Sequence, residues 1–142
     1  MMSEHEPRPN LSLPEMEAQH AYLYGLFDRI PLTTRVEDPS RMKALLEEIE
    51  RYVLFHFTSE ETLMRRYGLP GFGSHQTDHE NAGARLVTFL DDFDAGTLNP
   101  AALRTFLTGW LMQHTVDCDQ AYVAWILEKR RELEGGATAG SN

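Results

Sequence analysis

The segment YVLFHFTSEETLMRRYGLPGFGSHQTDH, which runs from Tyr52 to His79, decides how the chain folds. His56 and Glu60 lie four residues apart before a Gly/Pro break, and His75 and His79 lie four residues apart after it. Side chains with this spacing are about 40° apart around a helix axis, so each pair projects from one face. Two such helices that turn back on each other would direct four nitrogen and oxygen donors into one space. Imidazole and carboxylate together suit iron and related first-row metals.

Apolar residues recur at spacings of three and four in four stretches of the chain, which predicts four amphipathic helices. Pro31 stops the first of them. The dipeptides Asp38-Pro39 and Asn99-Pro100 are each typical of a capping residue followed by proline at the first helical position. Ser74 is the predicted cap of the third helix.

No alternation typical of strands competes with these helices, and the loops between them are short. The sequence therefore predicts an all-α fold, an up-down-up-down four-helix bundle. We expect a flexible N-terminal arm over residues 1–13, the bundle over 14–133 and a disordered, Gly-rich tail over 134–142.

The composition is that of an ordinary soluble domain of 142 residues. A formal net charge of −9 argues against nucleic acid and anionic membranes as partners. The single cysteine cannot form an internal disulfide, which fits a reducing compartment. Because the start has no apolar targeting segment and no long uncharged apolar run follows, we expect a cytoplasmic protein that does not bind membranes.

Five of the six histidines lie on the inward stripe of a predicted helix, and every helix supplies at least one: His20, His56, His75, His79 and His114. For any one of them alone, a core histidine with a satisfied hydrogen bond is the simpler interpretation. Five together with a glutamate would bury many polar groups without partners, each costing roughly 1–3 kcal/mol. A shared metal removes that difficulty, so we favour a metal site over a polar core.

Asp119 does not fit a regular helix. The inward stripe continues from His114 to Cys118, whereas Asp119 is turned about 140° from His114. Ligation by Asp119 would require the helix to widen locally, for instance through a π-bulge, which is frequent at functional sites. In the alternative, Asp117 and Asp119 form a solvated face and Cys118 packs inward. Spacing alone leaves both interpretations open.

With these residues in place, the chain resembles the hemerythrin family, and within it the small single-domain bacterial hemerythrins (bacteriohemerythrins). The match spans about residues 14–130 and rests on the ordered motifs QHAYL, H-F-x-x-E-E, H-x-x-x-H and W-L-x-x-H-x-x-x-x-D-x-x-Y. These motifs contain His20; His56, Phe57, Glu60 and Glu61; His75 and His79; and Trp110, Leu111, His114, Asp119 and Tyr122. Each motif alone is weak, but the ordered set is specific.

The resemblance implies a centre of two iron ions with unequal surroundings. One iron would be held by His75, His79 and His114. The other would be held by His20 and His56 and would keep an open position at which O₂ binds reversibly. Glu60 and Asp119 would bridge both ions, with an oxo or hydroxo group as the third bridge. The resemblance thus favours ligation by Asp119.

Reversible O₂ binding needs a dry pocket, because water and protons promote oxidation of such a site. Trp110 and Leu111 match the family's pocket-side positions one turn before the fourth-helix histidine, and Leu23, Tyr24 and Phe57 are nearby candidates. For all of these except Leu111, plain core packing is an equal alternative. Glu61, beside Glu60, is expected to support a ligand or to be solvated rather than to bind metal.

Three functions compete. The leading hypothesis is reversible O₂ binding for storage, delivery or buffering, which needs no substrate or catalytic base, so we do not expect an enzyme. The second is an O₂ or redox sensor that acts through an unidentified protein partner. The third is a di-iron oxidase or peroxidase, although ferritin-like oxidases use ligand sets richer in carboxylates.

Overall fold

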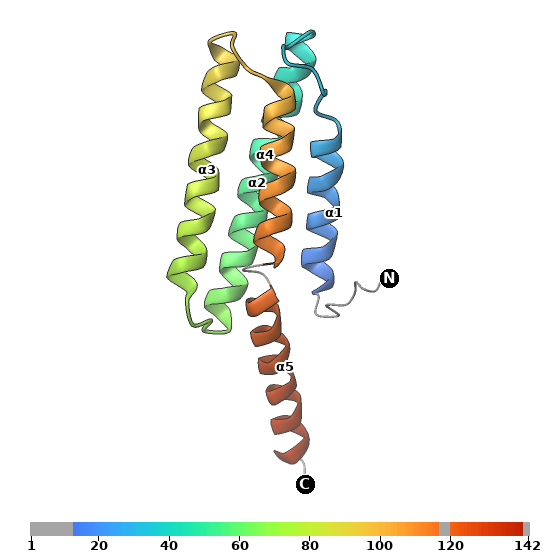
Figure 1. Cartoon of the computed structure of the whole chain (residues 1–142). Helices are drawn as coiled ribbons and strands as arrows, with labels where there is room; N and C mark the ends of the chain where they lie inside the picture. Colours follow the sequence, from blue (N-terminus) through green and yellow to red (C-terminus); the bar gives the residue numbers. More distant parts are fainter. Residues whose placement is uncertain (1–12, 117–119, 141–142) are drawn as a thin grey trace.

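The structure is a computed structural model that describes residues 13–116 and 120–140. All regular elements in these ranges are helices: α1 (Pro14–Asp28), α2 (Pro39–Arg66), α3 (Phe72–Asp94), α4 (Pro100–His114) and α5 (Gln120–Gly140). In Figure 1, α1 to α4 lie side by side and alternate in direction, and α5 extends beyond the end of the bundle. The predicted all-α, up-down-up-down bundle is confirmed. The predicted fourth helix corresponds to two described helices, α4 and α5.

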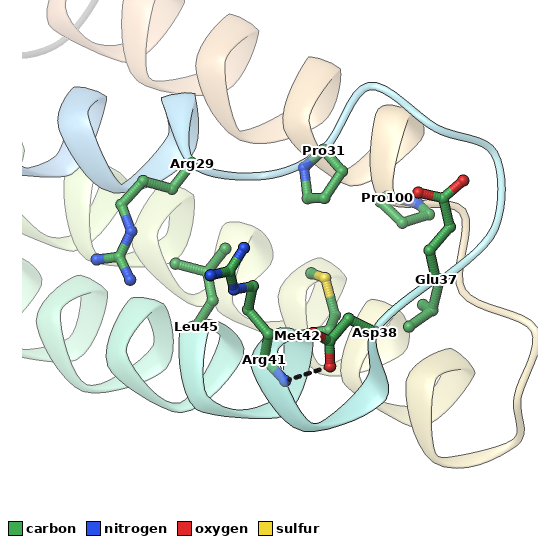
Figure 2. A pocket seen from close by; sticks show the side chains of 9 residues that line it. Arg29, Pro31, Glu37, Asp38, Arg41, Met42, Leu45 and Pro100 are labelled. Atoms are coloured by element: carbon green, nitrogen blue, oxygen red, sulfur yellow. Dashed lines mark hydrogen bonds between the residues drawn. The ribbon is translucent and has the colours of Figure 1, made fainter.

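Two of the three predicted N-caps are present. The side chain of Asp38 accepts a hydrogen bond of 3.2 Å from the backbone N–H of Arg41 (Figure 2), and Asn99 accepts one of 3.0 Å from Ala102. The prediction that Ser74 caps the third helix is wrong. Helix α3 begins before Ser74, at Phe72, because Gly71 adopts a left-handed conformation (φ 80°) that lets the chain turn and enter the helix earlier.

The Asp38 cap is expected to stabilise the fold by about 1 kcal/mol, because it satisfies one N–H group that the first turn of α2 leaves unpaired. Asp38→Ala should lower the free energy of unfolding by that amount, measured by urea denaturation. Asp38→Asn keeps a capping oxygen and is the matched control. An equal loss in both variants would contradict a capping role.

The apolar core consists of two clusters stacked along the bundle. The larger one fills the space among α1, α2, α3 and α4 and contains Leu23, Phe27, Ile49, Phe57, Leu86, Leu103 and Leu111. The smaller one joins α1, α2 and α5 and contains Leu13, Met16, Met64, Tyr122, Val123 and Ile126. Along α2, His56 and Glu60 come after most of the first cluster and before Met64 of the second. A buried polar layer therefore separates the two clusters.

Helix α5 is held to the rest of the bundle by directional contacts as well as by its apolar residues. Trp125 donates from Nε1 to the backbone carbonyl of Tyr67 at 2.7 Å. Arg130 donates to the hydroxyl of Tyr67 and to the carboxylate of Glu15, both at 3.1 Å. These bonds attach α5 to the end of α2 and to the start of α1.

The predicted terminal boundaries stay predictions, and described residues lie next to both of them. Residues 134–140, predicted to be disordered, continue α5, because an established helix adds residues without a new nucleation step and the glycines only weaken it. Leu13, assigned to the flexible arm, is fully buried in the smaller cluster. Residues 1–12 and 141–142 lie outside the described residues. Within the part of the chain that is described, no helix is both long and apolar enough to cross a bilayer.

Candidate metal centre

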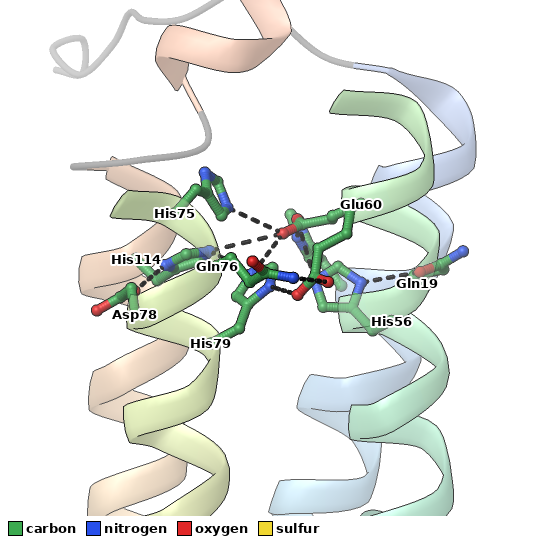
Figure 3. A network of polar contacts seen from close by, with 10 residues as sticks. Gln19, His56, Glu60, His75, Gln76, Asp78, His79 and His114 are labelled. Carbon is green, nitrogen blue, oxygen red and sulfur yellow. Dashed lines mark hydrogen bonds and ion pairs between the residues drawn. The ribbon is translucent and has the colours of Figure 1, made fainter. Parts of the chain in front are cut away.

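The polar layer between the two clusters gathers side chains from four helices. It consists of His20 from α1, His56 and Glu60 from α2, His75 and His79 from α3, and His114 from α4. All are buried except His20, whose side chain is 16% exposed. The four-residue spacing on α2 and α3 brings each pair to one face, as the sequence predicts, and Figure 3 shows these faces directed toward each other.

Glu60 lies at the centre of this layer, and its two carboxylate oxygens face different groups of histidines. Oε1 faces the Nε2 atoms of His75, His79 and His114, at 3.3, 3.0 and 3.6 Å. Oε2 faces the Nε2 atoms of His56 and His20, at 3.2 and 3.6 Å. One carboxylate thus divides five imidazoles into a group of three and a group of two.

The opposite ring nitrogen of three of these histidines bonds to an acceptor on a neighbouring helix. The three pairs are His56 Nδ1 with Gln19 Oε1 at 2.8 Å, His79 Nδ1 with Glu61 Oε2 at 2.8 Å, and His114 Nδ1 with Asp78 Oδ2 (Figure 3). When Nδ1–H donates to such an acceptor, Nε2 keeps its lone pair and faces Glu60. This is the tautomer that binds metals, and an outer acceptor fixes it and orients the ring.

The donor set fits a metal on each side of Glu60. The ligand atoms of Glu60, His75, His79 and His114 lie within 4.8 Å of one another, and so do those of His20, His56 and Glu60. Ligands held about 2.1 Å from one ion are about 3.0 Å apart when adjacent and about 4.2 Å apart when opposite. Among the described residues, His56 Nε2 and Glu60 Oε2 are also buried without a hydrogen-bond partner. Metal ligation would satisfy both atoms.

The surroundings of Glu60 keep it ionised. Burial by itself would raise the pKa of this carboxyl, but the surrounding imidazoles of His114, His20, His56 and His75 outweigh that effect and hold the pKa well below its ordinary value of 4.5. A bridging ligand needs this ionised form, because only a carboxylate offers a lone pair on each oxygen without a competing proton.

The lowered pKa of Glu60 predicts how the metal-free protein responds to acid. Because the folded pKa lies below the unfolded one, ionised Glu60 stabilises the fold above pH about 4.5, and this contribution is lost as the pH falls through the folded pKa. In urea denaturation between pH 7 and pH 3, Glu60→Gln should flatten the acid part of the stability curve. A variant curve parallel to the wild-type curve would contradict the assignment.

The backbone changes just after His114, where the sequence suggested local widening. Residues 115–116 form a π-helical turn that follows α4 directly, and the hydroxyl of Thr115 is buried there. A π-turn is frequent at functional sites and shifts the residues beyond it around the helix axis. Asp119 lies outside the described residues, so its ligation stays a prediction.

A small apolar cavity of about 10 Å³ adjoins the polar layer. It is lined by Leu23, Phe27, Val53, Phe57, Ala82, Leu86, Phe106, Leu107, Trp110 and Leu111. Four of the five predicted pocket residues are among them, whereas Tyr24 is not. Two aromatic rings separate this space from the three-histidine group: Phe57 stacks on His79 with centroids 4.1 Å apart, and Trp110 stacks on His114 at 4.5 Å.

Sequence reasoning missed two residues of this centre, Gln19 and Asp78. Both are polar residues next to a predicted ligand in the sequence, His20 and His79, and this adjacency was the available signal. Glu61 was expected to support a ligand or to be solvated, and it contacts His79 as well as accepting a 3.3 Å hydrogen bond from Gln76.

Comparison with known proteins identifies the fold that carries this centre. The profile of the hemerythrin HHE cation binding domain matches residues 12–126. The chain belongs to this family. Membership of this family accounts for the buried cluster of histidine and glutamate side chains in the helical bundle. The family and the geometry of the cluster both indicate a metal site.

Relatives of this hemerythrin-family chain match over most of its length. A bacteriohemerythrin of Stenotrophomonas maltophilia is 27% identical over 135 residues, which cover 92% of this chain and 88% of the relative. A bacteriohemerythrin of Pseudomonas aeruginosa is 26% identical over 132 residues, which cover 89% of this chain and 86% of the relative. The crystal structure of a wild-type hemerythrin superposes with a TM-score of 0.72 at 24% identity, over 79% of this chain and 87% of that one, and it supports the fold.

Proposed function

We propose that this protein holds two iron ions and binds O₂ reversibly. The observation that carries the proposal is the division of five imidazoles around one carboxylate, three facing Oε1 of Glu60 and two facing Oε2. In this proposal His75, His79 and His114 hold one iron, and His20 and His56 hold the other. Glu60 and Asp119 would each contribute a carboxylate to both ions, and an oxo or hydroxo group would complete the centre.

Iron at this centre would supply the reversible redox chemistry of O₂ binding. The chain's own contribution is to hold five imidazoles and an anionic carboxylate in place before any ion arrives. The Nδ1 acceptors fix the rings, and the ionised form of Glu60 offsets positive charge in a buried site. Because histidine dominates this ligand set, O₂ carriage fits it better than oxidase chemistry based on carboxylates.

The apolar cavity is the proposed O₂ pocket. Its walls near the polar layer come from Leu23, Phe57, Trp110 and Leu111, and its volume of about 10 Å³ is close to the smallest that holds one water-sized molecule. Apolar walls give water no hydrogen-bond partner, so an uncharged diatomic gas is favoured over water there. Tyr24 does not line this space, and we leave it out of the proposed pocket.

A sensor that acts through a protein partner is the second candidate. It is favoured by α5, which extends beyond the bundle and exposes 67% of Leu133. The same helix reaches the centre, since the ring of Tyr122 meets that of His75 edge-on with centroids 5.4 Å apart. A change at the centre would thus be in contact with a helix that projects from the fold. In either role we expect the protein to work in the cytoplasm.

The test is an anaerobic spectroscopic cycle. The metal-free protein is loaded with ferrous iron, freed of excess metal, exposed to air and then stripped of O₂ again. We expect a visible charge-transfer band that appears with O₂ and disappears when O₂ is removed. Immediate and irreversible oxidation of bound iron would overturn reversible carriage and favour the sensor or an enzyme, and failure to bind iron would overturn the proposal as a whole.

A further inference from the structure

The acceptor behind His56 in the two-histidine half differs in charge from those behind His79 and His114 in the three-histidine half. In the three-histidine half, His79 and His114 donate from Nδ1 to the carboxylates of Glu61 and Asp78. In the two-histidine half, His56 donates from Nδ1 to the amide oxygen of Gln19 at 2.8 Å. The hydrogen bonds from Nδ1 of His56 and from Nδ1 of His79 are both 2.8 Å long. These two histidines therefore differ in the charge of the acceptor and not in the length of the hydrogen bond.

The charge of the acceptor matters to the metal. A hydrogen bond from Nδ1–H increases electron density on the ring and makes Nε2 a stronger donor to a cation. A carboxylate accepts a stronger, charge-assisted bond than a neutral amide does. His79 and His114 are therefore the stronger donors to a cation, and His56 is the weaker one.

We propose that Gln19 is a positioning residue that makes the two-histidine half chemically different from the other half. Gln19 holds the His56 ring in place with a neutral acceptor. The two-histidine half is thereby left with the weaker metal affinity and the higher reduction potential. The inference rests on the proposed iron centre and concerns how its halves are tuned. A neutral acceptor favours the ferrous state at the half where O₂ is proposed to bind, because a less electron-rich imidazole stabilises the ferric state less. The carboxylates of the other half favour tight retention of its ion.

The position of Gln19 permits this tuning without disturbing the core. Gln19 lies on α1 directly before His20, and its side chain is only partly buried, at a groove between α1 and α2 that Met16, Phe55 and Ser59 also line. A glutamate at this position could keep the same hydrogen bond and remain in contact with solvent. Amide and carboxylate are nearly equal in size, so Gln19→Glu changes charge with little change in shape.

The experiment titrates the metal-free chain with Zn²⁺ by calorimetry, in competition with a chelator. We expect two binding steps of unequal affinity in the wild type. Gln19→Glu should tighten the weaker step by about 10–100-fold and leave the stronger one nearly unchanged, since outer partners of metal-bound histidines typically change affinity by that factor. Gln19→Leu, which removes the acceptor, should weaken the same step.

Two controls separate this role from general effects. Ala18→Glu adds the same charge at the neighbouring exposed position, where solvent and salt screen it, and should leave both steps nearly unchanged. Asp78→Asn should weaken the stronger step instead, by about 10–100-fold. The ¹⁵N–H resonance of His56 Nδ1 should persist in Gln19→Glu and move downfield, which verifies that the hydrogen bond is retained and strengthened.

The outcomes distinguish the inference from the function on which it rests. An unchanged weaker step in Gln19→Glu with a retained His56 resonance would overturn the inference, and so would equal shifts in Gln19→Glu and Ala18→Glu. A single Zn²⁺-binding step in the wild-type protein would overturn the two-metal centre itself. In the iron-loaded protein, Gln19→Glu should lower the reduction potential, and an unchanged potential would also contradict the tuning role.

Discussion

Replacing Glu60 with glutamine is expected to remove both metal ions from the chain. Glu60 is fully buried and faces all five imidazoles, so it is the one described side chain that belongs to both halves of the centre. Glutamine has almost the same shape but offers a single neutral oxygen and an N–H₂ group that points hydrogens at one half. The loss in affinity should exceed the about 10–100-fold that is typical of outer partners.

Metal content after gel filtration measures this effect. Glu61→Gln is the matched control, since it makes the same chemical change at the next residue, where the carboxylate contacts His79 from outside the centre. We expect Glu61→Gln to retain both ions at saturating metal and Glu60→Gln to retain neither. Two tightly held ions in Glu60→Gln would show that Glu60 is not a shared ligand.

The second large effect is expected from Leu111→Ala. Leu111 is fully buried and lines the apolar cavity one turn before His114. Truncation should lower the free energy of unfolding by about 2–5 kcal/mol, because it removes buried apolar contacts and leaves a larger void. It should also speed the oxidation of the iron-loaded protein in air, because the enlarged cavity admits water next to the centre.

The variant Leu107→Ala separates the effect of lost core packing from the effect of admitting water to the centre. Leu107 lines the same cavity and is also buried, but it lies one helical turn farther from His114. Urea denaturation should show a similar loss in the free energy of unfolding for both variants. Only Leu111→Ala should oxidise markedly faster, and the decay of the O₂-dependent band measures that rate. Equal oxidation rates in the two variants would remove Leu111 from the proposed pocket wall.

The sequence was sufficient for the parts of the fold that depend on residues close together in the chain. The four-residue spacings on α2 and α3 predicted which histidines share a face, and the Asp38 and Asn99 caps predicted where two helices begin. Such features follow from helix geometry alone. Ser74 failed as a cap because Gly71, three residues earlier, already provides the turn.

Which histidine each outer acceptor contacts could not be predicted, because the contacts depend on how neighbouring helices face each other. Gln19, Glu61 and Asp78 each adjoin a residue of the centre in the sequence, yet each contacts a histidine on another helix. A neighbouring residue is turned by about 100° around the helix axis, so it leaves the central face and meets the next helix. Adjacency suggests such a residue, and only the packed bundle shows which histidine it reaches.

The most direct test of the central claim is a crystal structure of the iron-loaded protein with anomalous data collected at the iron absorption edge. We expect two anomalous peaks on opposite sides of the Glu60 carboxylate. One should lie about 2 Å from the Nε2 atoms of His75, His79 and His114, and the other about 2 Å from those of His20 and His56. A single peak, or two peaks on the same side of Glu60, would contradict a centre divided into three and two histidines.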